Sequence, residues 1–451
     1  MLLIAQYVIP IVGDTLVGGA VLVRDGIIRD IGEAERMRLR YADEEVRDFG
    51  AAAILPGLID LHTHMENSVL RGIVPDQPYA SWIQAVRRAA SRLDVHDWHA
   101  SAIFGGLEAL SAGITCVADI SATGASCSAM TKLGLRGIVF REVGTMDKRR
   151  VEDAMRIARN DIVNWGESVD SSRIGIGIAP REAFDCHPAV FSDAARIARE
   201  EGIPLSLYLA ASREEYDFIR WGTSGLSVDN MQGRRGYVEI PPWLPTGVSP
   251  VRYLVNWGAF EADNVIAAHC VHVDAEDIRK LQEYDVAVAI CPRSNAQLSM
   301  GVAPLLEFIR SGLRVGLGTG YAVATDSSDI IKEMRYGMLL NRAMNPGRFI
   351  APETMLRMAT IDAARSLKLD GLIGSIEIGK RADLTAIDLS GSRQGSTGNP
   401  EAVVVNSSSS TDVLMTMVDG NIRYEKDKWN VDVEVARDIA RVIDIRGKLR
   451  K

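Results

Sequence analysis

Between residue 54 and about residue 370, short apolar segments alternate with amphipathic helical segments, and this repeated alternation limits the possible folds more than any other feature. Eight strand–helix alternations favour a closed parallel barrel over an open sheet. The sequence therefore predicts an α/β fold, a (β/α)8 TIM barrel. Its expected strands are Gly57–Leu61, Ile114–Asp119, Arg136–Arg141, Ile174–Ala179, Leu205–Ala210, Val265–His269, Val286–Ile290 and Val315–Gly318.

The two ends of the chain differ from its middle. Residues 1–53 look all-β, with a hairpin turn at Asp25-Gly26. Short strands return at Ala382–Ile387, Ala402–Val405 and Val413–Val418, before a second turn at Asp419-Gly420. We expect residues 1–53 and 371–425 to pair into one small β-sandwich domain beside a barrel of residues 54–370. Residues 426–451 are expected to carry a C-terminal helix.

The composition restricts the partners and the compartment. A formal net charge of -8 implies no basic face, which disfavours nucleic acid or an anionic membrane as a partner. Five scattered cysteines without a CxxC pair fit a reduced compartment better than a disulfide framework. The apolar start, Met1 to Val12, is too short to span a bilayer. We therefore expect a cytoplasmic protein.

The first chemically informative segment is the strand end that reads Leu55-Pro-Gly-Leu-Ile-Asp-Leu-His-Thr-His64. Side chains two residues apart on a strand point to the same side, so His62 and His64 can reach one point. That point would lie at the C-terminal mouth of the barrel, where barrel enzymes keep their sites. Imidazole is a common ligand of divalent transition metals. The alternative is two hydrogen-bonded histidines without an ion.

The pattern Pro-Gly-x-x-Asp-x-His-x-His on a first barrel strand resembles the amidohydrolase superfamily. Arg71-Gly72, Pro78 and Trp82 are similar to its branch of chlorohydrolases, S-adenosylhomocysteine and methylthioadenosine deaminases, and guanine deaminase. The resemblance covers nearly the whole chain and implies a homodimer. Further matching segments are Glu108–Thr115, Ala268–Cys270, Pro292–Asn295, Ser327–Arg335, Met358–Ala364 and Gly374–Asp383.

The resemblance also implies a set of metal ligands that this chain does not have in full. In that family, two strand-one histidines, a strand-five histidine and a strand-eight aspartate bind a metal that activates water. A glutamate after the strand-five histidine moves protons. Here Tyr208, Ala211 and Gly320 stand at the strand-five histidine, the glutamate and the aspartate, and Arg181 replaces a strand-four histidine.

One divalent metal, zinc or iron, is implied by the family, and the departures predict that it is bound weakly or not at all. His62 and His64 remain as its ligands. Three kinds of side chain could replace the absent metal ligands: Tyr208 as a phenolate, Asp326 or Asp329 from the strand-eight loop, and Glu66 after the histidine pair. The alternative is that these aspartates cap a helix or are solvated, and that Glu66 anchors a loop or lies at the surface.

Three side chains are candidates for catalysis or substrate binding. The Arg181 guanidinium is suited to a carboxylate or phosphate, and the alternative is an ion pair with Glu182 or Asp185. Tyr208 is an acid or a substrate contact, or it packs against the barrel wall. His269 is a general base and substrate contact, or a satisfied polar residue.

Two hypotheses follow. The first is an amidohydrolase-like hydrolase that acts on a non-peptide C–N bond of a small anionic or heteroaromatic compound, with an incomplete metal site. The second is a catalytically silent homologue that binds a small molecule or serves as a partner subunit. Arg181 and Tyr208 favour a repurposed pocket, whereas Ala211 and Gly320 favour decay.

Overall fold

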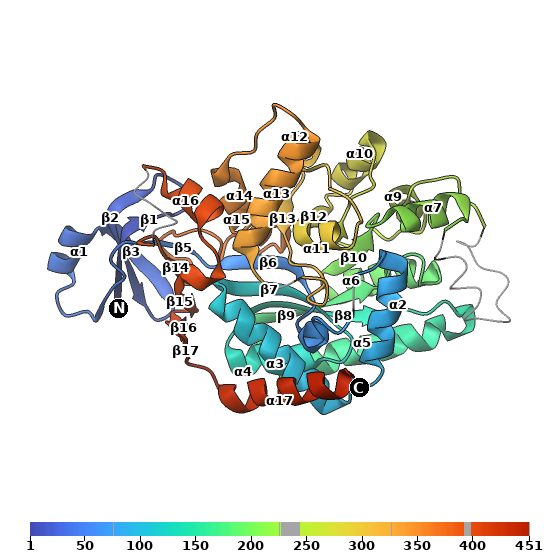
Figure 1. Ribbon diagram of the computed structural model, residues 1–451, viewed down its shortest axis with the longest axis horizontal. Coiled ribbons are helices and arrows are strands. Elements are labelled where there is room, and N and C mark those ends of the chain that lie inside the picture. Colours follow the sequence, from blue (N-terminus) through green and yellow to red (C-terminus); the bar gives the residue numbers. More distant parts are fainter. Residues whose placement is uncertain (75, 225, 227–243, 326, 392–397, 451) are drawn as a thin grey trace.

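The computed structural model describes residues 1–74, 76–224, 226, 244–325, 327–391 and 398–450. Eight parallel strands follow one another in sequence order around a barrel. An isolated bridge between Thr63 and Gly320 joins the first and last of them, so the barrel is nearly closed. The predicted fold class is confirmed (Figure 1). The strands are β6 (Leu58–Thr63), β7 (Ile114–Ser121), β8 (Arg136–Val143), β9 (Ile174–Pro180), β10 (Leu205–Leu209), β11 (Val265–His269), β12 (Ala287–Ile290) and β13 (Val315–Leu317).

Helices cover the outside of the barrel. Helix α3 begins at Val95, directly after Asp94, which forms a capping box with Asp97. The helices from the first strand to the end of the barrel are α2 (Tyr79–Ala90), α3 (Val95–Ser111), α4 (Ala125–Leu133), α5 (Val151–Ser168), α6 (Ala189–Glu201), α7 (Arg213–Trp221), α9 (Pro250–Asn256), α10 (Ala275–Glu283), α11 (Pro292–Gln297), α12 (Leu305–Ser311), α13 (Ile330–Met344), α14 (Pro352–Met358) and α15 (Ile361–Ser366). Two 3-10 turns, η1 (Met65–Leu70) and η2 (Lys148–Arg150), follow β6 and β8.

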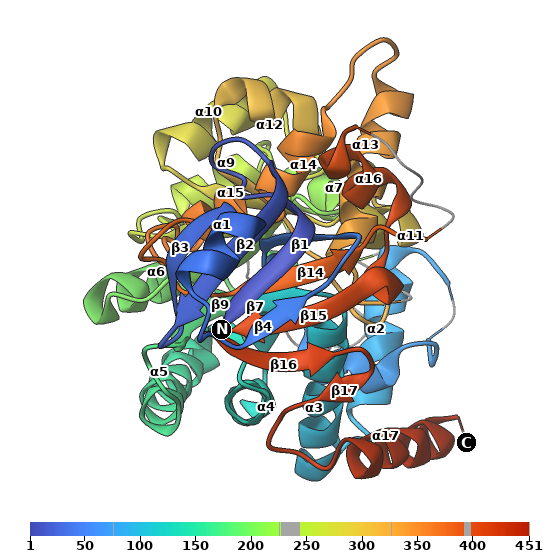
Figure 2. The same ribbon diagram turned by 90° about the vertical axis from the view of Figure 1, so that its left-hand side faces the viewer.

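Both chain ends enter one nine-stranded sheet beside the barrel (Figure 2). Its two halves enclose a common core that includes Leu3, Val21, Leu384 and Met415. The halves meet where β5 pairs with β1 in parallel and with β14 antiparallel. The domain boundaries at residues 53 and 371 stay a proposal. The strands are β1 (Leu2–Val8), β2 (Leu16–Arg24), β3 (Ile27–Glu33), β4 (Val46–Asp48), β5 (Ala52–Pro56), β14 (Leu384–Asp388), β15 (Val413–Val418), β16 (Asn421–Glu425) and β17 (Lys428–Trp429).

Two expectations for the chain ends were wrong. Residues 1–53 are not all-β, because α1 (Ala34–Arg40) lies between β3 and β4. The expected strand Ala402–Val405 lies inside α16 (Pro400–Ser407), which the 3-10 turn η3 (Ser410–Asp412) follows. Asn399 caps α16 through the amide N–H of Ala402, and Pro400 occupies its first turn. These two signals start a helix despite the β-branched valines.

The C-terminal helix α17 (Val435–Leu449) packs along α3 (Figure 1). Its buried residues are Val442, Ile445 and Leu449. Arg446 donates to the carbonyl oxygens of Ser68 (3.0 Å) and Val69 (3.2 Å), so the helix also holds the turn η1 that follows His64.

A buried ion pair joins the barrel to the sheet. Arg136 at the start of β8 donates to Asp383 at 2.7 and 3.2 Å, and it is 3.3 Å from Asp419. Both Arg136 and Asp383 are almost completely buried. Within the described ranges, no helix is both long and apolar enough to cross a membrane.

Candidate functional site

The barrel mouth brings together the histidines and the tyrosine that the sequence singled out. The ring centroid of His62 lies 5.2 Å from that of His64, 5.4 Å from that of Tyr208 and 5.4 Å from that of His269. All four side chains are buried. They come from the C-terminal ends of β6, β10 and β11, as expected for a barrel of parallel strands.

Tyr321, which the sequence analysis did not single out, lies in the centre of this cluster. Its ring is stacked on His64 with centroids 4.8 Å apart, and its centroid lies 5.9 Å from His269 and 6.2 Å from Tyr208. Its hydroxyl donates to Glu182 Oε1 at 2.9 Å. Only 4% of Tyr321 is exposed, so the side chain is fixed among the site residues rather than turned to solvent.

A chain of hydrogen bonds leads from a carboxylate to the histidine pair. The Tyr208 hydroxyl donates to Glu142 Oε1 at 3.2 Å and lies 3.4 Å from His64 Nε2. Nε2 of His64 is the donor or the acceptor in this contact, depending on the tautomer of the ring. The contact ties His64 to Tyr208 and, through it, to Glu142.

His269 is held in one orientation. Its Nδ1 lies 2.7 Å from Asn295 Oδ1, an acceptor, so Nδ1 carries the proton and Nε2 has the lone pair. Nε2 is buried and has no hydrogen-bond partner among the described residues, and the same holds for His62 Nε2. The backbone of His269 has φ +74°, a region that residues other than glycine seldom adopt and that recurs at functional sites.

Burial keeps these imidazoles neutral. Desolvation lowers the pKa of His62 well below its usual value. It lowers the pKa of His64 to about 3, with a further contribution from the charge of His269, and it lowers the pKa of His269 to about 4. Desolvation and the nearby carboxylate of Glu142 raise the pKa of Tyr208 well above its usual value. Without a bound cation, Tyr208 is thus a neutral phenol.

Gly320 and Ala211 stand where the family resemblance implies an aspartate and a glutamate. At both positions the backbone N–H makes a hydrogen bond. The Gly320 N–H donates to the His62 carbonyl at 2.8 Å, with φ +69°. A Cβ on Gly320 would lie 2.9 Å from Ser294 Cβ, too close for a real contact. The N–H of Ala211 donates to Glu215 Oε2 at 2.8 Å. Glu215 therefore binds the backbone of this loop and does not replace the missing proton-moving glutamate.

The proposed compensating carboxylates have other roles. Asp329 caps α13 through the amide N–H of Lys332 and also accepts from the Ser410 N–H. Glu66 accepts from Ser121, Ala122 and Thr123, so it anchors the loop after β7. Asp326 lies outside the described residues.

Arg181 forms the ion pair that the sequence left open as an alternative. Its Nη1 lies 3.2 Å from Asp185 Oδ2, and its Nη2 donates to the Gly144 carbonyl at 2.8 Å. Asp185 is also 3.1 Å from Arg87, so two guanidinium groups share it. Arg181 nevertheless keeps 29% of its side chain exposed, at the edge of two cavities.

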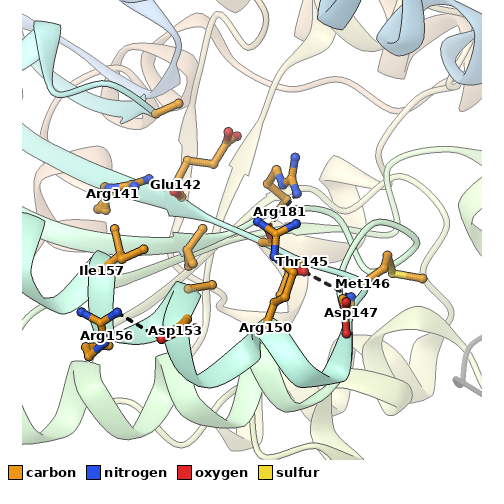
Figure 3. A pocket seen from close by; sticks show the side chains of 14 residues that line it. Arg141, Glu142, Thr145, Met146, Asp147, Arg150, Asp153, Arg156, Ile157 and Arg181 are labelled. Carbon is orange, nitrogen blue, oxygen red and sulfur yellow. Dashed lines mark hydrogen bonds and ion pairs between the residues drawn. The ribbon is translucent and has the colours of Figure 1, made fainter. Parts of the chain in front are cut away.

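A groove of about 890 Å³, which we call the outer groove, opens beside the barrel mouth. Its lining residues are Ala122, Arg141, Glu142, Val143, Gly144, Thr145, Met146, Asp147, Arg150, Asp153, Ala154, Arg156, Ile157 and Arg181. The outer groove lies between the ends of β8 and β9 and helix α5, with Arg150 and Arg181 on one side and Arg156 on the other (Figure 3). The inner cavity has about 170 Å³ and is lined by Trp98, Tyr208, Tyr321 and His64, among others. The two share Ala122, Glu142 and Arg181, so they adjoin.

The comparisons with known proteins agree with this architecture. Residues 53–423 match the Amidohydrolase family, and the chain therefore belongs to the amidohydrolase family. It is 30% identical to a 5-methylthioadenosine/S-adenosylhomocysteine deaminase of Symbiobacterium thermophilum over 93% of this chain and 92% of that one. A protein of the same name from Desulforamulus reducens is 28% identical over 90% of this chain and 88% of its own length.

Solved structures show the same fold. An adenosine deaminase from Xanthomonas campestris with bound zinc has a TM-score of 0.83 at 23% identity, covering 100% of this chain and 98% of that chain. An atrazine chlorohydrolase from Arthrobacter aurescens TC1 complexed with zinc has a TM-score of 0.83 at 22% identity, covering 99% of each chain. The predicted resemblance to the chlorohydrolase and deaminase branch is thus confirmed.

The residues present do not fit the zinc that these neighbours hold. Among the described residues, no group of three or more His, Cys, Asp or Glu side chains is arranged to hold a metal ion. Within the described ranges, no carboxylate forms a hydrogen bond or ion pair with the side chains of His62, His64 or His269, and Glu142 and Glu182 are bonded to Tyr208 and Tyr321 instead. The His64 Nε2 is used by Tyr208.

Sequence reasoning missed Glu142, Glu182, Tyr79 and Tyr321. Tyr79 and Tyr321 both donate to Glu182 Oε1, so all three belong to one buried network. For Tyr321 and Glu182 the sequence did contain a signal, which is their position next to a departure from the family pattern. Tyr321 directly follows the aspartate position that became Gly320, and Glu182 directly follows Arg181. Glu142 ends a predicted strand but has no sequence pattern that connects it to Tyr208.

Proposed function

We propose that this chain binds a small anionic or heteroaromatic compound at the barrel mouth and lacks the metal-assisted hydrolysis of its family. The observation that carries this proposal is the position of Tyr321. Its ring is stacked on His64 with centroids 4.8 Å apart and lies 5.9 Å from that of His269, so it takes up the space beside both histidines. Tyr208 and Gly320 supply no metal ligand, so activation of water by a metal has no basis in these side chains.

The small-molecule part of the proposal rests on the two adjoining cavities. Arg181 reaches both of them, and a guanidinium binds carboxylates or phosphates through paired hydrogen bonds. Its pairing with Asp185 leaves donors in excess, because a guanidinium has five N–H groups. The names of the similar relatives, which are deaminases of small molecules, support a ligand of this size.

The test is a ligand screen by thermal shift with matched acids and amides. We expect acids to raise the melting temperature and amides of the same shape to have a smaller effect. Arg181→Ala should abolish the shift. Equal stabilisation by acids and amides, or a shift that persists in Arg181→Ala, would contradict the anionic ligand.

The second candidate is hydrolysis of a non-peptide C–N bond without a tightly bound metal. The geometry of His269 favours it, because Asn295 fixes the ring with a bare, unpartnered Nε2 as a base. Tyr208 would be the acid. A lowered pKa makes this base weak, however, and general acid–base groups work best near the operating pH.

Turnover assays separate the two candidates. We expect no appreciable deamination of adenosine, guanine or their thioether relatives, because the proton-moving glutamate and part of the water-activating set are absent at Ala211, Tyr208 and Gly320. Release of ammonia at a rate that His269→Gln reduces at least tenfold would favour the hydrolase and overturn the non-catalytic proposal.

A further inference from the structure

The inner cavity adjoins the outer groove at the side of the barrel. Ala122, Glu142 and Arg181 line both spaces. On the other side of the inner cavity, Tyr321 is fixed by its hydrogen bond to Glu182 and by stacking on His64. A compound that passes from the outer groove therefore meets Glu142 and Arg181 before it reaches Tyr208.

Glu142 has unused capacity to accept hydrogen bonds. Among the described residues, the Tyr208 hydroxyl is the one donor to its carboxylate. An ionised carboxylate offers about four acceptor positions. Glu66, by contrast, accepts from three donors, and Glu182 accepts from two tyrosines and pairs with Arg87. Glu142 is therefore the carboxylate of the inner cavity that is left to bind a ligand.

The charges around the inner cavity favour a cation. The carboxylates are Glu66, Glu142, Glu182 and, behind them, Asp185, whereas the guanidinium groups are Arg87 and Arg181. Four acids thus stand against two bases. The side chains of Glu66, Glu182 and Asp185 are buried, and burial of uncompensated charge is costly. Desolvation raises the pKa of Glu142, and the charge of Arg181 opposes this shift, so a bound cation would favour the ionised carboxylate.

The walls of the inner cavity suit a flat organic cation. Trp98, Tyr208 and Tyr321 contribute aromatic rings, and Ile83 and Val86 contribute apolar surface. Aromatic faces attract amidinium and guanidinium groups. A volume of about 170 Å³ is enough for a single ring or a short guanidino compound but not for a drug-sized ligand.

We propose that the inner cavity takes a planar amidinium or guanidinium group and that Glu142 is the residue that selects it. The proposal rests on the proposed function and adds the orientation of the ligand. The cationic nitrogen group lies inward against Glu142, and the anionic group stays in the outer groove beside Arg181. The ligand class is then a small amidino or guanidino acid.

The experiment compares three probes of one shape: benzamidine as the cation, benzamide as the neutral form and benzoate as the anion. We expect benzamidine to bind in calorimetric titration at low salt and benzamide to bind at least tenfold more weakly. Glu142→Gln should weaken benzamidine binding at least tenfold. Glu152→Gln removes the same charge from an exposed position on α5 that lines neither cavity, and should retain benzamidine binding.

The outcomes separate this proposal from the one on which it rests. If benzoate binds through Arg181 and benzamidine does not bind, Glu142 has no such role while the proposed function stands. If none of the three probes binds, both fail. Equal benzamidine affinity in the unaltered chain and in Glu142→Gln also overturns the assignment.

A second measurement covers the case in which Glu142→Gln does not fold. In the unaltered chain, benzamidine should slow hydrogen exchange in the segment 139–147, which carries Glu142, and benzamide should not. Glu142→Asp, which keeps the charge, should retain part of the benzamidine affinity. Unchanged exchange in that segment at saturating benzamidine would rule the site out.

Discussion

At the level of single residues, Tyr321 and Gly320 are the two obstacles to restoring the family's metal site. A Cβ at residue 320 would lie 2.9 Å from Ser294 Cβ and 3.2 Å from Cys291 Cβ, at a backbone φ of +69°. Replacing Gly320 by aspartate therefore introduces strain as well as a carboxylate, at a cost of about 1–3 kcal/mol. The Tyr321 ring also lies against His64.

We predict that the unaltered protein holds well under one equivalent of zinc, iron or nickel after purification. Tyr208→His with Gly320→Asp should restore the ligand types but raise metal occupancy little, because Tyr321 still fills the site. Adding Tyr321→Gly to these two substitutions should raise the metal occupancy further. Metal analysis after dialysis checks the series, and Tyr321→Gly alone is the control. A stoichiometric, chelator-resistant metal in the unaltered chain would refute this prediction.

His269 should make the fold sensitive to acid. The pKa of its imidazole is lowered to about 4 by burial, against an ordinary value of 6.5. Above pH 6.5 the ring is neutral in both folded and unfolded chains and has no effect on their balance. As the pH falls from 6.5 towards 4, the unfolded chain takes up a proton that the folded chain does not, so stability is lost.

We therefore expect His269→Gln to lose less stability than the unaltered protein between pH 6.5 and pH 4. The difference has an upper bound of about 1.4 kcal/mol per pH unit. Urea unfolding at pH 7.5, 6 and 5 measures it. His96→Gln at an exposed position is the matched control and should follow the unaltered protein. Parallel pH profiles for all three proteins would contradict the neutral, buried state of His269.

At the scale of elements, α17 supports the histidine pair from a distance. Arg446 bonds the carbonyl oxygens of Ser68 and Val69 in η1, and its guanidinium lies 5.3 Å from the centroid of the Phe104 ring. We expect Arg446→Ala to lower the free energy of unfolding by about 1.5–3 kcal/mol, as is typical for hydrogen bonds to a charged group. Urea unfolding measures this loss.

The exposed Arg437 of the same helix provides the control, because its ion pair with Glu434 has both side chains about four-fifths exposed. Arg437→Ala should change stability by less than about 0.5 kcal/mol. An equal loss in the two variants would show that the contact of Arg446 with η1 adds nothing specific to stability.

The elements themselves were largely predictable, except for α1 and α16 at the chain ends. The barrel strands were found within two residues because both of their faces are buried, which gives continuous apolar runs. The segment Ala402–Val405 was misassigned because its three valines have high β propensity. Helix-starting contacts at Asn399 and Pro400 outweighed that propensity in α16.

At the scale of the whole molecule, one ion pair connects the barrel with the sheet. Arg136 and Asp383 are 2.7 Å apart and both are buried. Asp383→Ala would leave Arg136 with the partly exposed Asp419 at 3.3 Å and the Ser172 carbonyl oxygen at 3.3 Å. We expect a loss of about 3–5 kcal/mol, typical when one partner of a buried pair is removed. Urea unfolding followed by tryptophan fluorescence measures it.

Asp388→Ala, further along the same strand and half-buried, is the comparison and should cost much less. A small effect of Asp383→Ala, equal to that of Asp388→Ala, would mean that sheet and barrel hold together through apolar contacts alone.

The site was predictable only in part, because its new members come from distant strands and loops. His62 and His64 follow from two-residue spacing on one strand, and His269 and Tyr208 follow from the family resemblance. The hydrogen bond from Tyr208 to Glu142 joins residues 66 positions apart, and that from Tyr321 to Glu182 joins residues 139 apart. No periodicity in the sequence indicates such long-range pairs, because they depend on how the whole barrel closes.

The stacking of Tyr321 on His64 also restricts the order of any evolutionary return to metal chemistry. A mutation that restores a ligand at residue 208 or 320 gives no functional advantage while the tyrosine ring remains, and the change at residue 320 carries its own strain. Removing Tyr321 first breaks its hydrogen bond to Glu182 and opens a cavity beside the histidines, again without benefit. Under the proposed function, a gain of metal chemistry would therefore need changes at residues 208, 320 and 321 together.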